Sequence, residues 1–366
     1  MTRILKSPGI YVQGPDEIDN LYVYLKRYGK KPLILISSNG LKRYGARIEQ
    51  LLAENNITCQ FEIFGGHPSK KEINRLCEIV KQSGNDIVVG AGGGKIIDTV
   101  KGVAHYMKLP LVIVPTVAST DAPCSSLGVI YKENDEFDEY ISFDNCPNVV
   151  LVDTKIIVQT APEFLVAGMG DALATYYEAR AVQMSGKKTR FGAFPTKSAF
   201  ALAKESRDII IAEGLAAKLA CEKKEVDEAF ENVVEANTYL SGVGFESGGT
   251  AAAHAMHKGF TFCPEAHELY HGRIVAFCLI TQLILENAPR QELDEVIEFM
   301  ISVGLPVCFE ELGLPELSDE SLRLIAENTT YEDGTLYHMP FMITELMVFE
   351  ALKKADAMGR EYRLRV

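Results

Sequence analysis

Short apolar runs alternate with amphipathic stretches through the first part of the chain. The run LILIS at residues 33–37 ends in Ser-Ser-Asn-Gly, and a stretch of helical periodicity follows it. Apolar runs of this kind are typical of parallel strands that crossover helices bury on both faces. The alternation continues through the helical KKEINRLCEIVKQSG and KIIDTVKGVAHYM and the strand-like TCQFEIF, DIVVGAGGG, LPLVIVPT and VVLVD. The pattern predicts a doubly wound α/β domain with a mainly parallel sheet.

The pattern changes near residue 160. Strand-like runs nearly vanish, and helical periodicity with Gly or Pro between segments continues to the end, as in FLVAGMGDALATYYEARAVQ. We therefore predict an α/β domain over residues 1–160, followed by an all-α domain over residues 161–366. Because no low-complexity or proline-rich linker separates the two domains, we expect them to share a cleft.

Charge and composition narrow the possible partners. The net charge of −13 argues against nucleic acid or an anionic membrane, because binding to phosphate-rich surfaces needs a basic face. A small or neutral ligand is a better match. Pro8 and Gly9 interrupt any secretory signal, and the longest apolar run, at residues 111–118, is far shorter than the roughly 20 residues that span a bilayer. We expect a soluble, cytoplasmic protein with eight reduced cysteines.

A glycine-rich segment, GAGGGKIID at residues 90–98, joins a predicted strand to a predicted helix. Glycines at such a turn let backbone N–H groups and the positive end of a helix approach a pyrophosphate. The segment is not the GxGxxG fingerprint, because Lys95 holds the place of the third glycine, and it is not a Walker A loop. The turn is therefore either a phosphate-binding site or a purely structural tight turn.

A hydroxyl-rich segment, PTVASTDAPCSSLGVIY at residues 115–131, follows the next buried strand. It should lie at the carboxyl edge of the sheet, where doubly wound folds bind ligands. Its single carboxylate, Asp121, is flanked by serines and threonines. Asp121 is either a ligand-binding group or a capping residue in a turn.

Four of the seven histidines lie between Ser247 and Phe277. His254 and His257 are spaced i, i+3, and His267 and His271 are spaced i, i+4, so that either pair could chelate a metal from a helix. Spacing does not choose between the pairs. The best carboxylate to complete a mononuclear site is Asp171, at a glycine-marked helix start, and its alternative role is an N-cap.

Five motifs in one order carry a resemblance to a known family. They are GGGKxxD at 92–98, PTxASTDAP at 115–123, DALATYYEAR at 171–180, ESGGTAAAHAMHKG at 246–259 and HGRIVAF at 271–277. Together they resemble the metal-dependent (iron-containing type) alcohol dehydrogenase superfamily, and within it the enzymes that oxidise glycerol. The match extends from SPGIYVQG near the N-terminus to the later helices.

The resemblance implies an NAD-binding α/β domain, an all-helical metal domain and an active site in the cleft between them. It implies Asp171, His254 and His271 as ligands of one divalent metal, with zinc usual in this branch and iron possible. It places Asp121, Phe245 and His254 around the substrate and implies a homo-oligomer. The implied cofactor contacts are Ser38, Gly92, Gly93, Gly94, Lys95, Asp98, Thr116, Ser119, Ser125, Leu127 and Tyr131.

The implied activity is the oxidation of glycerol, or of related vicinal diols such as 1,2-propanediol, to a ketone such as dihydroxyacetone, by hydride transfer from a metal-bound alkoxide to NAD. Alternatives are a dehydroquinate-synthase-like lyase, a dehydrogenase of glycerol phosphate and a non-catalytic dinucleotide sensor. The first two need cations to recognise anionic substrates, and the two motifs that carry the histidines offer only Lys258 and Arg273. The sensor has no physical need for an open metal site.

Two positions depart from the family pattern. Ser38 stands where relatives usually carry an aspartate that binds the adenosine ribose, and Lys42 and Arg43 follow closely. Loss of the acid removes the repulsion against a 2′-phosphate, so we expect weaker discrimination against NADP than is usual. Glu268 stands where relatives often have a second histidine beside the one that matches His267.

Overall fold

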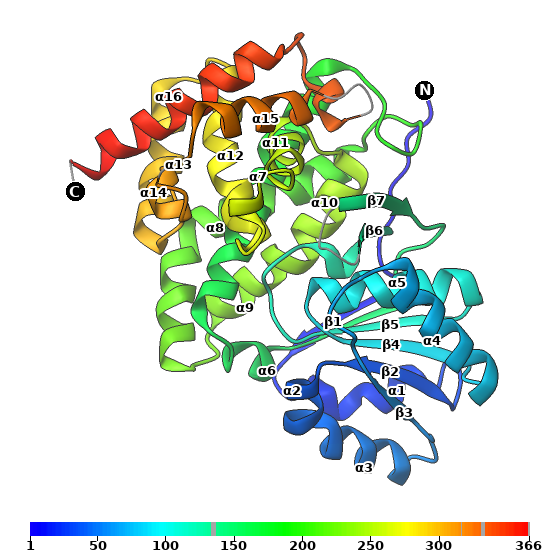
Figure 1. Cartoon of the computed structure of the whole chain (residues 1–366). Coiled ribbons are helices and arrows are strands. Elements are labelled where there is room, and N and C mark those ends of the chain that lie inside the picture. The colour runs from blue at the N-terminus through cyan, green and yellow to red at the C-terminus, as the bar shows by residue number, and fades with distance from the viewer. Residues whose placement is uncertain (133–136, 316, 331–333, 365–366) are drawn as a thin grey trace. The chain divides into compact units, whose positions relative to one another are not determined.

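The computed structural model describes residues 1–132, 137–315, 317–330 and 334–364, and it divides into two compact units (Figure 1). The α/β unit comprises residues 6–161 and 223–226. The helical unit comprises residues 1–5, 162–222 and 227–366. The predicted division at residue 160 differs from these bounds because the first five residues lie in the helical unit, where Arg3 forms a parallel bridge with Phe194. The short segment 223–226 belongs to the α/β unit, where Lys224 donates to the Thr160 carbonyl at 2.6 Å.

The α/β unit is built on a six-stranded sheet in the order β1-β8-β5-β4-β2-β3, and every pairing in it is parallel. The central strands consist of consecutive buried residues, as expected for strands covered on both faces. The two edge strands, β1 and β3, are only partly buried. The strands are β1 Ile10–Gly14, β2 Pro32–Ile36, β3 Gln60–Ile63, β4 Ile87–Gly92, β5 Leu111–Pro115 and β8 Val149–Asp153.

Helices cover both faces of this sheet (Figure 1). Residues of η1, α1 and α3 pack with Ile34, Val89 and Val112 in one apolar cluster. The alternate residue Gly90 faces α5, where a Cβ on the glycine would lie 2.5 Å from Val100. The helices are η1 Glu17–Asn20, α1 Leu21–Leu25, α2 Ser38–Gly40, η2 Leu41–Gly45, α3 Ala46–Glu54, α4 Lys70–Ser83, α5 Gly94–Met107, η3 Ala122–Cys124 and α6 Thr154–Val158.

A two-stranded antiparallel sheet, β6 Leu127–Tyr131 with β7 Phe137–Ser142, follows η3 in the same unit. The side chains of β6 alternate between buried and partly buried positions. Residues 115–131 were predicted to lie at the carboxyl edge of the sheet, and this pairing was not predicted. The end of that segment therefore belongs to regular structure.

The helical unit is organised around two buried helices, α7 Pro162–Ser185 and α12 His271–Leu285. Most of their residues are buried, 16 of 24 in α7 and 13 of 15 in α12, so both lie in the interior of the unit. The π-helix η4 continues from α9 directly into α10. The other elements are α8 Lys197–Lys223, α9 Glu228–Glu235, η4 Ala236–Leu240, α10 Ser241–Gly248, α11 Ala252–Phe260, η5 Pro264–Ala266, α13 Arg290–Val303, α14 Phe309–Leu312, α15 Asp319–Thr329, η6 Thr335–His338 and α16 Glu345–Arg363.

Two glycines let α7 and α12 approach closely. A Cβ on Gly272 would lie 1.8 Å from the Ala167 carbonyl oxygen, and a Cβ on Gly170 would lie 2.4 Å from the Gly272 carbonyl oxygen. Distances this short exclude any side chain at either position. The backbones of the two helices are therefore in direct contact at this crossing.

The predicted fold class is confirmed: a parallel α/β unit precedes a helical one. Within the part of the chain that the structure describes, no helix combines the length and the hydropathy needed to cross a membrane.

Candidate metal and dinucleotide sites

Asp171, His254 and His271 come together in the helical unit. One potential ligand atom from each residue lies within 4.8 Å of the other two. Oδ1 of Asp171 is 3.3 Å from Nε2 of His254 and 3.2 Å from Nε2 of His271. Two imidazole nitrogens and one carboxylate oxygen on a common point match the donors of a mononuclear site for zinc or iron.

Three different helices supply these side chains. Asp171 lies in the interior of α7 and is fully buried, so the predicted helix start and the alternative N-cap role are both wrong. The helix continues through both glycines that flank Met169, and the second of them, Gly170, allows the close contact with α12. His254 lies in the first turn of α11, and His271 is the first residue of α12.

In each candidate histidine ligand, the Nδ1 atom, on the side of the ring away from Asp171, contacts another side chain. His254 Nδ1 lies 2.5 Å from Oε2 of Glu178, and His271 Nδ1 lies 2.9 Å from Nε2 of His257. Both contacts leave the Nε2 atoms directed at Asp171. Partners that hold the other ring nitrogen are typical of metal-binding histidines, because they fix the orientation of the ring.

Glu178 was not singled out by the sequence analysis. Its side chain is fully buried, and its Oε1 accepts hydrogen bonds from the backbone N–H groups of Ala251 and His254 at 2.8 and 2.9 Å. The available signal was its spacing from Asp171, because seven positions along α7 are about two helical turns and place both carboxylates on one face.

The charges around the cluster displace several pKa values. Burial disfavours the charged form of Asp171, but His271 and His254 outweigh burial and hold its pKa below the ordinary value. Burial also disfavours the imidazolium of His254, yet Glu178 and Asp171 raise its pKa well above normal. Burial and the neighbouring histidines 271 and 254 lower the pKa of His257. The site therefore stabilises positive charge between Asp171 and Glu178, as a cation site requires.

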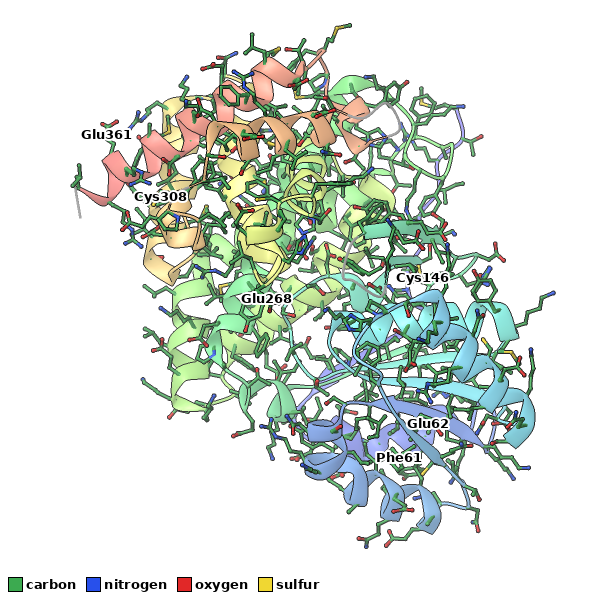
Figure 2. All side chains as sticks on the ribbon, viewed as in Figure 1. Phe61, Glu62, Cys146, Glu268, Cys308 and Glu361 are labelled. Atoms are coloured by element: carbon green, nitrogen blue, oxygen red, sulfur yellow. The ribbon has the colours of Figure 1, made fainter. Side chains whose placement is uncertain are left out.

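The second predicted chelating pair does not form on a helix. His267 lies in the exposed turn before α12, and its Nε2 is 3.0 Å from the Thr261 carbonyl oxygen. Glu268, the departure from the family pattern, is exposed in the same turn (Figure 2). The i, i+3 pair does share α11, but His257 contacts His271 and is outside the cluster.

The glycine turn of the α/β unit lies between β4 and α5. Gly93 is the N-cap residue of α5 and provides no side-chain cap, and a Cβ on it would lie 3.2 Å from a methyl group of Val117. Because Gly93 has no side chain, a ligand can approach the backbone N–H groups at the start of α5 closely. Such a helix terminus is suited to a pyrophosphate.

Strand register brings other predicted cofactor residues to the same sheet edge. Ile36 pairs with Ala91, and Gly92 pairs with Pro115, so β2, β4 and β5 end side by side. Ser38 follows β2 and is exposed, whereas Lys95 is exposed in the first turn of α5. Thr116 follows β5, and its N–H donates to the Gly92 carbonyl at 3.1 Å. At this edge the direction of chain progression reverses between β2 and β4, which is the point where ligands of open α/β sheets bind.

The buried side chain of Lys101 forms hydrogen bonds with residues 122–127, in the segment that follows Thr116. The ammonium of Lys101 donates to the carbonyl oxygens of Ala122 and Leu127 at 2.7 and 2.6 Å and to Ser125 Oγ at 3.0 Å. It also lies 3.8 Å from a carboxylate oxygen of Asp98. Lys101 was missed by the sequence analysis, although a lysine on a helix that is buried over most of its length was a usable signal.

Three of the predicted cofactor residues thus contact Lys101: Asp98, Ser125 and Leu127. Tyr131 lies at the end of β6, and its N–H donates to the Pro68 carbonyl at 3.0 Å. Ser119 lies in the partly buried loop before η3.

The two remaining substrate candidates lie in different units. Asp121 is buried at the start of η3 in the α/β unit, and Phe245 is buried in α10 of the helical unit. The expectation that these residues face one substrate stays a prediction, as does the expectation of an active site shared by the two units.

Comparisons with known proteins identify relatives of the whole chain. The family model described as iron-containing alcohol dehydrogenase matches residues 8–154. The chain is 44% identical over 362 residues to a glycerol dehydrogenase of Escherichia coli O6:H1, covering 99% of each protein. It is 39% identical over 363 residues to a glycolaldehyde reductase of Halobacterium salinarum, covering 99% of this chain and 100% of that protein.

A solved structure agrees with these sequence relatives. The glycerol dehydrogenase of Schizosaccharomyces pombe aligns with a TM-score of 0.95 at 35% identity, covering 99% of this chain and 92% of the other. The alignment includes both the α/β unit and the helical unit. On sequence and structure together, the chain belongs to the iron-containing alcohol dehydrogenase family.

Proposed function

We propose that the protein is a metal-dependent, NAD-linked glycerol dehydrogenase, which oxidises glycerol and related vicinal diols such as 1,2-propanediol at the secondary hydroxyl. The observation that carries the proposal is the convergence of Asp171, His254 and His271 on one point. Support for glycerol as substrate comes from the relatives of that name that align with the whole chain.

The donor set fits a divalent metal. Three protein ligands leave coordination positions for a substrate, and the histidines are held by partners on their other nitrogens. We propose zinc, although the same donors also suit iron. When bound, the metal supplies a Lewis acid that lowers the pKa of a substrate hydroxyl, and NAD supplies the hydride acceptor.

The protein's part in the reaction is placement. We propose that Asp121 accepts hydrogen bonds from substrate hydroxyls near the nicotinamide, and that Phe245 forms an apolar wall that limits water. Gly92 to Lys95 would hold the pyrophosphate through backbone N–H groups at the start of α5. Ser38 would contact the adenosine ribose, and Asp98, Thr116, Ser119, Ser125, Leu127 and Tyr131 would surround the rest of the dinucleotide.

The alternatives have weaker support. A lyase like dehydroquinate synthase, or a dehydrogenase of glycerol phosphate, needs a basic pocket for its anionic substrate. Near the cluster, the Arg273 guanidinium instead donates to the carbonyl oxygens of Gly304 and Glu311 at 3.2 and 2.8 Å. We also propose a cytoplasmic location, which cell fractionation tests, and a homo-oligomeric state, which sedimentation of the purified protein tests.

The decisive experiment measures NADH formation by metal-analysed protein on glycerol, 1,2-propanediol, ethylene glycol and glycerol phosphate. We expect turnover of the uncharged diols, loss of activity after chelation and recovery with added zinc. Asp171→Asn should abolish metal binding and activity. The surface variant Asp208→Asn, on α8, is the matched control and should retain both. Full activity in the metal-free protein, or turnover of glycerol phosphate alone, contradicts the proposal.

A further inference from the structure

Both carboxylate oxygens of Glu178 bind groups at the start of α11, and His254 contacts each of them. Oε1 accepts from the N–H groups of Ala251 and His254, and Oε2 lies 2.5 Å from His254 Nδ1. The side chain is fully buried and reaches from α7 to the start of α11. The backbone and the ring of His254 are therefore held by the same group.

An ionised carboxylate accepts hydrogen bonds and cannot donate them. The short contact with Oε2 therefore requires a proton on Nδ1 of His254. When the ring carries only that one proton, Nε2 presents its lone pair toward Asp171, 3.3 Å away. The contact thus selects the nitrogen that faces the proposed metal.

We propose that Glu178 is a positioning residue that fixes the tautomer and the ring orientation of His254 and thereby sets the metal affinity of the site. The proposal rests on the metal site of the proposed function. Carboxylates that hold the outer nitrogen of a histidine ligand typically change metal affinity by about 10–100-fold when they are replaced.

A purely structural role is the competing explanation. Ala251, the N-cap residue of α11, provides no side-chain cap, so Glu178 also caps the start of that helix by accepting from the N–H groups of Ala251 and His254. A cap alone would make Glu178 important for folding and irrelevant to the choice of nitrogen. The two roles make different predictions for an isosteric amide.

The variant Glu178→Gln distinguishes the tautomer-fixing role from the capping role. The amide oxygen of glutamine can still accept from Ala251 and His254 N–H, but its NH₂ group then faces His254 Nδ1. Two donors cannot hydrogen-bond each other, so the ring must move its proton to Nε2 and lose the lone pair that would bind metal. We expect the zinc affinity of E178Q to fall 10–100-fold, with a smaller change in the stability of the metal-free protein.

Asp153 offers a matched control. It is also fully buried, and it accepts from the N–H groups of Asp16, Ile18, Lys155 and Ile156 in the α/β unit. Asp153→Asn keeps the shape and removes the charge of a carboxylate that binds only backbone N–H groups in these contacts. It should lower the free energy of unfolding and leave the zinc affinity unchanged.

The experiment titrates metal-free wild type, E178Q and D153N with zinc against a chromophoric chelator and measures urea unfolding of each in parallel. If wild type binds zinc and E178Q binds it within threefold of wild type, the inference is overturned while the metal site stands. If D153N loses as much affinity as E178Q, general destabilisation explains the effect and the inference is also overturned. If wild type binds no zinc, the proposed metal site fails first.

A second measurement does not depend on the folding of E178Q. Nitrogen-15 NMR of zinc-loaded, histidine-labelled wild type should find the proton of His254 on Nδ1, with its signals assigned by their absence in His254→Asn. A proton on Nε2 would overturn the inference.

Discussion

Replacing Lys101 by methionine should destabilise the α/β unit strongly. Lys101 is only 2% exposed, and its ammonium donates to three acceptors of the segment that carries Asp121, at 2.6, 2.7 and 3.0 Å. Methionine has a similar length and fills the same space, but it donates nothing. The variant therefore isolates the hydrogen bonds from the packing.

The expected cost follows from these contacts. A hydrogen bond to a charged group contributes about 1.5–3 kcal/mol, and such contributions do not add fully. Removing one member of a buried ionic network costs about 3–5 kcal/mol, because the remaining groups stay desolvated. Asp98, 3.8 Å from the ammonium, also loses a neighbouring positive charge. We expect Lys101→Met to lower the free energy of unfolding by about 3–5 kcal/mol.

The assay is urea unfolding followed by far-ultraviolet circular dichroism, since the chain contains no tryptophan for fluorescence. Calorimetric titration with NAD gives a second readout. The control is Lys95→Met, on the same helix but exposed, which should change stability by less than about 0.5 kcal/mol while weakening NAD binding. If Lys101→Met unfolds within about 1 kcal/mol of wild type, the structural role assigned to Lys101 is refuted.

Three further predictions concern the two sites. His271→Ala should lose metal and activity together, whereas His257→Ala should retain metal with reduced affinity, as metal analysis would establish; the reverse result would refute the ligand assignment. Gly272→Ala should cost at least about 1–3 kcal/mol in urea unfolding, because its Cβ would overlap the Ala167 carbonyl, and a neutral effect would contradict the close crossing. Ser38 should permit use of NADP, and Ser38→Asp should suppress it; a wild-type kcat/KM preference for NAD above about 10³-fold would argue against this.

The sheet was largely predictable because runs of consecutive apolar residues mark its central strands in the sequence. Local pattern could not supply the partners of each strand. The pairing of β1 with β8 depends on contacts between segments that are distant in sequence. The pairing of β6 with β7 joins strands whose polar residues resemble a loop in sequence. The helical unit was predicted as helices, but its close crossing depends on glycines that resemble helix boundaries in sequence.

The candidate site was only partly predictable. Spacing identified two histidine pairs and could not choose, because a metal site selects residues by position in space. The ligand set came from the resemblance, and the structure brings those three residues together from three helices. Glu178 and Lys101 were missed because each acts through backbone groups or side chains that sequence does not place nearby.

The glycine contact between α7 and α12 would influence how fast the proposed site takes up a metal. Gly170 directly precedes Asp171, and His271 directly precedes Gly272, so two of the proposed metal ligands adjoin the residues at which the helix backbones touch. Their separation is set when the helices pack, before any ion is present. Little reorganisation then accompanies binding, so the speed of metal uptake should depend on how fast an ion reaches the site and loses its water.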